Sequence, residues 1–117
     1  MNTAEQVTWQ DLRAKSLDKM TTIEETLRSC GYEQVDAYPI NRFAFRVRIV
    51  DPRLDEIPFH ERGSFVADDL LKIPEEIEEN ITSLFLFSPR ELAASAEDEL
   101  RVYSMNREFT EPTLSIL

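Results

Sequence analysis

The chain has 117 residues and a formal net charge of -10 at pH 7, because 23 Asp and Glu residues outnumber 13 Lys and Arg residues. The acidity makes nucleic acid and anionic membrane surfaces poor partners, because binding to phosphates needs clustered Lys and Arg. The hydrophobic content of 42% is typical of a globular protein, and the length suits one domain with a modest core.

Cysteine use and the chain's N-terminal segment indicate a cytoplasmic protein. A single cysteine, Cys30, excludes an internal disulfide framework and fits a reducing compartment. Residues 1–6 carry neither the basic start nor the apolar run of a secretory signal. No apolar stretch approaches the length that a bilayer span needs.

The N-terminal part predicts two helices. Apolar residues at helical spacing indicate a helix over about residues 9–20, a break near Thr21 and a second helix over 22–30. The second helix begins with the capping box Thr22–Glu25. Gly31 ends it, because glycine adopts a left-handed conformation at little cost.

Two strands follow. A weak strand over 33–38 is expected to pair antiparallel with a strand over 43–50 through a turn at 39–42. Alternation along the second strand places Arg46 and Arg48 on one face. The opposite, buried face takes the apolar residues Phe43, Phe45, Val47 and Ile49.

Residues 51–63 read as a polar loop, after which Ser64 caps a helix that ends or kinks at Pro74. A short acidic helical turn over 74–79 follows, with proline near its start. These assignments leave residues 51–63 without regular structure.

The segment 81–87 is apolar at both odd and even positions, which is typical of a central strand covered on both faces. Ser88, Pro89 and Glu91 then form a capping box that starts a helix reaching to about Ser95. From residue 101 onward periodicity is poor, which predicts an extended or disordered tail over 101–117.

These elements predict an α+β fold with a small three-stranded mixed sheet and helices packed on one face, in the order α-β-β-α-α-β-α. Residues 1–100 would form a single domain. No internal repeat and no interdomain linker divides the chain.

Four segments in this order resemble the BolA family, whose fold is related to the type II KH domain. They are residues 22–27, 45–50, 62–66 and 81–91. The resemblance implies a BolA-like α+β fold over about residues 22–95. It also implies pairing with a monothiol glutaredoxin around a 2Fe–2S cluster, held in that family by a histidine at a helix start and often by a Cys or His between the first two strands.

This chain departs from the family at those ligand positions. Gly63 stands where the family has its histidine, and the turn at 39–42 contains neither Cys nor His. His60 and Arg62 are the residues that remain for a cluster-related role. The RNA-binding Gly-x-x-Gly loop of KH domains is also missing, because the chain's two glycines are Gly31 and Gly63.

The residue patterns do not predict an enzyme. His60 is the single histidine, whereas metal sites normally use three or four ligands, so neither a metal nor another cofactor is predicted. No serine has a nucleophile-elbow pattern and no phosphate-binding loop is present.

A protein-binding surface is the remaining candidate. Arg46 and Arg48 share their face of the sheet with either Phe85 and Phe87 or Leu84 and Leu86, and an aromatic patch beside arginines suits a protein partner. The alternatives are that residues 1–20, the tail or a second copy cover this face.

We interpret the chain as a non-catalytic protein-interaction or adaptor domain, present as a monomer or weak homodimer. The candidate binding residues are Arg46, Arg48, Phe85 and Phe87. The alternative function is that of a BolA-like partner of a monothiol glutaredoxin in iron–sulfur cluster handling, acting through His60 and Arg62.

Overall fold

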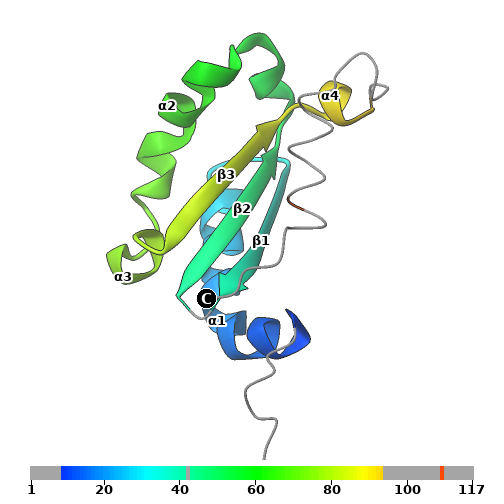
Figure 1. The fold of residues 1–117 in the computed structure, drawn as a ribbon. Helices are drawn as coiled ribbons and strands as arrows, with labels where there is room; N and C mark the ends of the chain where they lie inside the picture. The colour runs from blue at the N-terminus through cyan, green and yellow to red at the C-terminus, as the bar shows by residue number, and fades with distance from the viewer. Residues whose placement is uncertain (1–8, 42, 94–108, 110–117) are drawn as a thin grey trace, which may run out of the picture.

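Helices and strands follow one another closely along the chain, and the computed structural model describes the backbone of residues 9–41, 43–93 and 109 (Figure 1). Side chains are described from residue 16 onward within these ranges. The elements are α1 (Trp9–Ser29), β1 (Gln34–Asn41), β2 (Ala44–Val50), the 3-10 helix η2 (Pro52–Glu56), α2 (Phe59–Leu70), α3 (Glu75–Glu78), β3 (Ile81–Phe87) and α4 (Pro89–Ala93).

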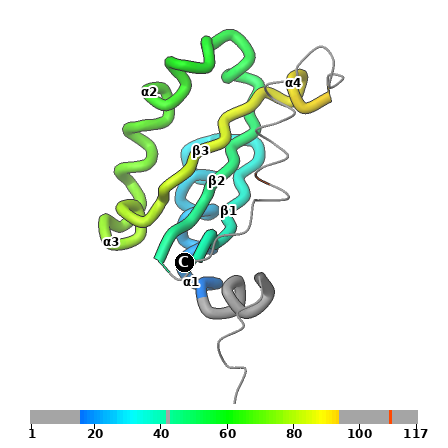
Figure 2. Tube along the Cα trace, in the orientation of Figure 1, coloured from blue at the N-terminus to red at the C-terminus, as the bar shows by residue number. Residues whose placement is uncertain are grey.

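The three strands form one mixed sheet in the order β1-β2-β3. β1 and β2 pair antiparallel, as predicted, and β2 and β3 pair parallel. A parallel pair needs a crossover connection, which η2, α2 and α3 supply together. Figures 1 and 2 show α1 behind the sheet and α2 running alongside β3. The predicted α+β class and three-stranded mixed sheet are confirmed.

The core lies between one face of the sheet and the helices. β2 supplies Phe45, Val47 and Ile49, and each is at most 1% exposed. α1 supplies Ile23 and Leu27 from one side of the helix. The remaining buried members of the core are Met20, Tyr32, Val35, Ala37, Leu54, Val66, Ile73 and Leu86. Burying each of the larger side chains contributes about 1.5–3 kcal/mol, so this layer is the main source of stability.

The central strand is β2, so the prediction that residues 81–87 form the central strand is wrong. β3 lies at an edge of the sheet, yet its residues alternate between the core and the opposite face. Leu86 is buried in the core, and Phe87 is buried on the other side. Coverage of both faces therefore explains the apolar pattern without a second neighbouring strand.

α1 is one continuous helix, so the predicted break near Thr21 is wrong. The hydroxyl of Thr22 donates to the carbonyl of Asp18, with an O–O distance of 2.9 Å. Threonine satisfies its hydroxyl in this way inside a helix, and it does not act as a cap here. Gly31 has a φ of 96°, which confirms the predicted left-handed end of this region.

The β1–β2 connection is tighter than predicted. β1 continues to Asn41, and β2 starts at Ala44. The side-chain carbonyl of Asn41 accepts from the backbone N–H of Phe43 at 2.8 Å, which closes the turn locally. Phe43 therefore lies outside the strand and is 74% exposed, so its predicted place on the buried face is wrong.

Residues 51–63 are largely helical, which corrects the predicted polar loop. The carboxylate of Asp51 accepts from the backbone N–H of Arg53 at 2.9 Å and caps η2. α2 then begins at Phe59 directly after Pro58, five residues before the predicted cap at Ser64. Its start is fixed at long range, because the Arg62 side chain in its first turns bonds to other elements.

The elements after α2 agree with the sequence. The acidic turn over 74–79 contains α3, and β3 has the predicted bounds. Ser88 caps α4, since its hydroxyl accepts from the backbone N–H of Glu91 at 3.2 Å. The Glu91 carboxylate accepts from the backbone N–H of Ser88 at 2.9 Å, which completes the capping box. The predicted end of this helix near Ser95 lies outside the described residues.

The predicted tail over 101–117 also lies outside the described residues, apart from Phe109. The described part of the chain contains no helix that is long and apolar enough to cross a membrane.

Candidate functional site

The face of the sheet that points away from α1, called the second face, is built from alternate residues of the three strands. These residues form rows across the strands: Tyr38–Arg46–Ser83, Asp36–Arg48–Phe85 and Gln34–Val50–Phe87. The sequence alone did not decide whether Phe85 and Phe87 or Leu84 and Leu86 lie beside the arginines. The register places Phe85 and Phe87 there, and Leu86 with Leu84 packs against the core.

The ring of Phe109 occupies the middle of the second face and is 0% exposed. Its centroid lies 5.4 Å from the ring of Tyr38 and 5.3 Å from the ring of Phe85. The guanidinium carbons of Arg46 and Arg48 lie 5.4 Å and 4.5 Å from the same centroid. We call the four residues around Phe109 the aromatic–arginine socket.

The two arginines make the socket specific for an aromatic ring. The guanidinium of Arg46 is over the ring of Tyr38 at 5.7 Å as well as over that of Phe109, and the residue is 6% exposed. A cation over an aromatic face contributes about 0.5–1 kcal/mol when exposed and about 2 kcal/mol when desolvated. Guanidinium is planar and weakly hydrated, so it tolerates such burial better than an ammonium group.

Arg48 is held in place from the other side by Asp36. Its Nη2 donates to Asp36 Oδ2 at 3.0 Å, and Gln34 Nε2 donates to the same oxygen at 2.9 Å. The ion pair is part-buried, with side-chain exposures of 15% and 26%. This arrangement fixes the Arg48 guanidinium over the Phe109 ring.

Not every predicted binding residue is accessible. Phe85 is half-buried and forms one wall of the socket. Phe87 lies on the same face but is 0% exposed, so it offers no contact surface to a partner. The alternative that the tail covers this face agrees with the position of Phe109.

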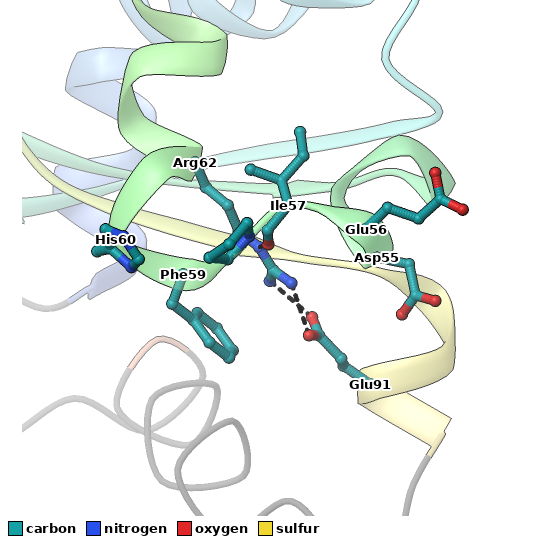
Figure 3. A pocket seen from close by; sticks show the side chains of 8 residues that line it. Asp55, Glu56, Ile57, Phe59, His60, Arg62 and Glu91 are labelled. Atoms are coloured by element: carbon teal, nitrogen blue, oxygen red, sulfur yellow. Dashed lines mark hydrogen bonds and ion pairs between the residues drawn. The ribbon is translucent and has the colours of Figure 1, made fainter.

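The residues His60 and Arg62 lie at the start of α2, beside an open depression of about 730 Å³ (Figure 3). The depression is lined by Asp55, Glu56, Ile57, Pro58, Phe59, His60, Arg62 and Glu91. The His60 side chain is 81% exposed, and its Nε2 is 3.4 Å from Glu61 Oε2. His60 is therefore accessible on a helix, although the sequence placed it in a loop.

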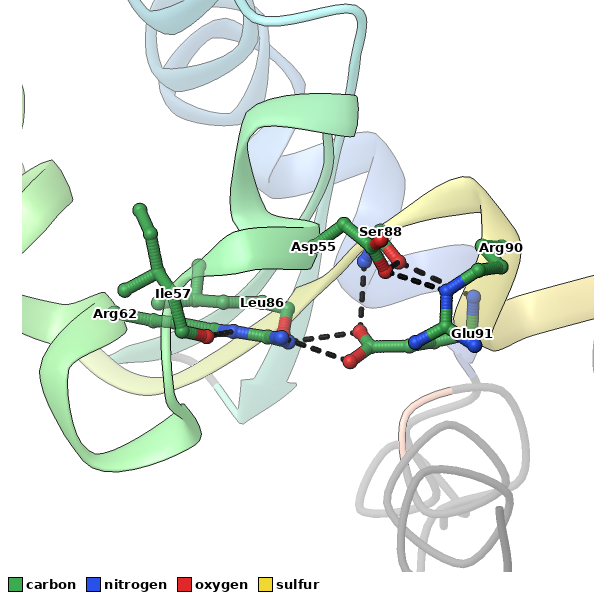
Figure 4. Close-up of polar contacts among 7 residues, drawn as sticks. All are labelled: Asp55, Ile57, Arg62, Leu86, Ser88, Arg90 and Glu91. Atoms are coloured by element: carbon green, nitrogen blue, oxygen red, sulfur yellow. Dashed lines mark hydrogen bonds and ion pairs between the residues drawn. The ribbon is translucent and has the colours of Figure 1, made fainter. Parts of the chain in front are cut away.

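Arg62 is the best-satisfied polar side chain beside the depression (Figure 4). Its Nη1 and Nη2 donate to the two carboxylate oxygens of Glu91 at 2.8 Å and 2.7 Å. Nη1 also donates to the carbonyl of Leu86 at 3.0 Å, and Nε donates to the carbonyl of Ile57 at 2.7 Å. Arg62 thus connects α2 to β3, to α4 and to Ile57, the residue that follows η2.

The carboxylates of Glu91 and Asp55, which pair with arginines beside the depression, are stabilised in their charged forms. Burial alone would raise the pKa of Glu91, but the Arg62 guanidinium and the backbone N–H of Ser88 outweigh it and lower that pKa. The pKa of Asp55 is lowered by Arg90, whose Nε donates at 2.7 Å, and by the Ser88 hydroxyl at 2.9 Å. These groups bond to one another, and their pairing connects η2, α2 and α4.

The described residues do not provide a set of ligands for a metal or cluster. No group of three or more His, Cys, Asp or Glu side chains among them has a suitable arrangement. Cys30 Sγ is 3.9 Å from Nζ of Lys72, a residue that follows the C-terminal end of α2. His60, in contrast, lies at the start of α2. An α-helix of 12 residues is about 18 Å long, so the two side chains cannot share one ion. Burial raises the pKa of the Cys30 thiol, which disfavours the thiolate.

Sequence reasoning missed two features of these sites. Tyr38 belongs to the weak first strand, and only its register with Arg46 reveals it as a wall of the socket. The pairing of Arg62 with Glu91 spans 29 residues, and its one local signal is the capping-box glutamate itself. Comparison of the chain with protein-family models, with curated proteins and with solved structures finds no match.

Proposed function

We propose that this chain is a non-catalytic protein-interaction or adaptor domain that binds its partner through the second face of the sheet. The observation that carries the proposal is the aromatic–arginine socket, in which Arg46, Arg48, Tyr38 and Phe85 surround one ring. Arginine and aromatic residues are enriched at the centres of protein interfaces, where they supply much of the binding energy.

The charge distribution adds support. The chain carries a net charge of -10, yet the rows of the second face contain two arginines and a single carboxylate, Asp36. A locally positive and aromatic face on an acidic protein suits a partner segment with acidic and aromatic groups. The polar cluster beside the depression has its bonds within the chain, which favours a structural over a catalytic role for Arg62 and Glu91.

The proposal is tested by affinity purification from cells with two charge-reversal variants. Arg48→Glu places a negative charge in the socket, and Lys19→Glu makes the same charge change at an exposed site on α1, on the other side of the sheet. We expect proteins captured by the parent to be retained by Lys19→Glu and lost by Arg48→Glu, with both variants folded by circular dichroism. Identical capture by both variants would overturn the proposal.

A second candidate is a BolA-like partner of a monothiol glutaredoxin. The strand order, with one antiparallel and one parallel pair, and the exposed His60 in the first turn of α2 support it. Because the described residues lack a ligand set of their own, His60 would add one ligand to a cluster held mainly by the glutaredoxin. Co-expression with a monothiol glutaredoxin should then give visible charge-transfer absorbance that His60→Ala changes. An absence of absorbance, or absorbance that His60→Ala leaves unchanged, would exclude it.

A further inference from the structure

We propose that the aromatic–arginine socket is a recognition site for a phenylalanine within an acidic peptide segment, and that Phe109 occupies it as an intramolecular competitor. The inference rests on the proposed function and names both the chemistry of the partner and the means by which binding is restrained. The starting observation is that Phe109, which follows α4 in the chain, fills a site formed by side chains of β1, β2 and β3.

The geometry selects an aromatic ring. Phe85 meets the Phe109 ring edge to face at an interplanar angle of 67°, and Tyr38 meets it at 58°. Both angles are far from parallel stacking and use the positive edge and negative face of the rings. The Arg48 guanidinium lies 4.5 Å from the Phe109 centroid. An aliphatic side chain would fill the space but would lose the attraction to both guanidinium groups.

The charges around the socket select acidic neighbours for that ring. In the sequence, Phe109 directly follows Glu108 and lies two residues before Glu111. Arg46 and Arg48 both contact the ring, whereas the rows of the second face contain a single carboxylate, Asp36, which pairs with Arg48. A peptide that carries Glu near its Phe would therefore match the local field, although the chain as a whole is acidic.

Exchange of Phe109 for a partner's phenylalanine is physically accessible. Emptying the socket exposes apolar ring surface, but it also exposes the buried guanidinium of Arg46 and the part-buried one of Arg48 to water, and their hydration offsets part of the loss. The covalent connection gives Phe109 an effective concentration on the order of mM. A separate peptide must compete against that concentration, so removing the Phe109 ring should strengthen peptide binding by about tenfold or more.

The test uses a fluorescein-labelled peptide of residues 105–113 and the full chain, measured by fluorescence anisotropy. We expect the Phe109→Ala chain to bind this peptide at least about tenfold more tightly than the parent chain does. The same peptide with Phe109→Ala should not bind, and the peptide with Phe109→Leu or with Glu108→Gln and Glu111→Gln should bind more weakly. Arg48→Glu added to the Phe109→Ala chain should remove binding.

Two controls keep the result interpretable. If Phe109→Ala does not fold, the Phe109→Leu chain retains bulk in the socket, and it should bind the peptide more tightly than the parent. Lys19→Glu in the Phe109→Ala chain should leave binding unchanged. Equal affinity of the parent and the Phe109 variants, or equal binding of the alanine peptide, would overturn the inference.

The other occupant, a second copy, gives a distinct outcome. A dimer of the parent chain that is seen in sedimentation and is lost in Phe109→Ala would show exchange of tails between copies and would overturn intramolecular occupancy.

The inference can also fail while the proposed function holds. If no peptide binds but Arg48→Glu still loses the captured partner, the second face binds proteins through other chemistry. If the peptide binds as expected but Arg48→Glu captures the same proteins as the parent, the adaptor function fails instead.

Discussion

Arg62 and Glu91 are 29 residues apart in sequence and form a two-point ion pair whose side chains are 3% and 5% exposed. The pair connects α2 to the capping box of α4, and the remaining donors of Arg62 reach the carbonyls of Leu86 and Ile57. Four of the five N–H groups of the guanidinium are thereby used. The pair fixes the relative position of helices on both sides of β3's end.

Removal of the Glu91 carboxylate should destabilise the protein strongly. Glu91→Ala leaves the Arg62 charge buried without its partner, and breaking a buried pair in this way costs about 3–5 kcal/mol. Urea denaturation measures the loss as a change in the free energy of unfolding. Lys72→Ala is the control, because its pair with Asp69 is 62% exposed on the lysine side and an exposed pair contributes about 0–1 kcal/mol. A Glu91→Ala cost no larger than that of Lys72→Ala would contradict a structural role for the pair.

The same carboxylate predicts a dependence of stability on acid pH. Its pKa in the folded protein is lowered from the ordinary 4.5, so the folded state binds fewer protons than the unfolded state in this range. The stabilisation is therefore complete above about pH 4.5 and is lost as pH falls through the lowered folded-state pKa. Urea unfolding of the parent and of Glu91→Gln between pH 7 and pH 3 should show a shallower acid decline for the variant. Parallel curves would count against this assignment.

Tyr32 and Asp69 predict an effect at alkaline pH. The Tyr32 hydroxyl donates to Asp69 Oδ2 at 2.6 Å, and burial together with this carboxylate raises the pKa of Tyr32 above its ordinary 10.0. Stability from this bond is present below pH 10.0 and is lost as pH rises through the raised folded-state pKa. Absorbance titration of the parent minus Tyr32→Phe isolates this phenol, and we expect a midpoint above 10.0. At pH 7, Tyr32→Phe should cost about 1–2 kcal/mol. A midpoint at or below 10.0 would show that the hydrogen bond does not hold in solution.

The elements that the sequence predicted well are those with local determinants. β3 has the expected bounds because its apolar run is followed at once by the capping box of Ser88 and Glu91. α2 was misplaced because Ser64 resembles a cap, whereas the helix start is fixed by bonds from Arg62 to residues of other elements. A single sequence carries no signal for such distant contacts.

The second face was predicted in part for the same reason. Strand alternation places Arg46 and Arg48 together on one side of β2, and this follows from the period of a strand. The choice of Phe85 as their neighbour depends on the register of a parallel pair, and the choice of Phe109 as the ring between them depends on a contact across the whole fold. Neither is set by local sequence.

The two glycines give opposite predictions for the same added methyl group. Gly31 has a φ of 96°, and a Cβ there would meet no heavy atom within 4 Å, so Gly31→Ala introduces backbone strain alone and should cost about 1–2 kcal/mol. Gly63 also has open space, but it lies inside α2, where Ala is favoured over Gly by about 0.5–1 kcal/mol. Urea denaturation should therefore show Gly31→Ala less stable and Gly63→Ala more stable than the parent. The second result also tests where α2 begins, because a helix that started at Ser64 would leave Gly63 outside it and would not gain from alanine.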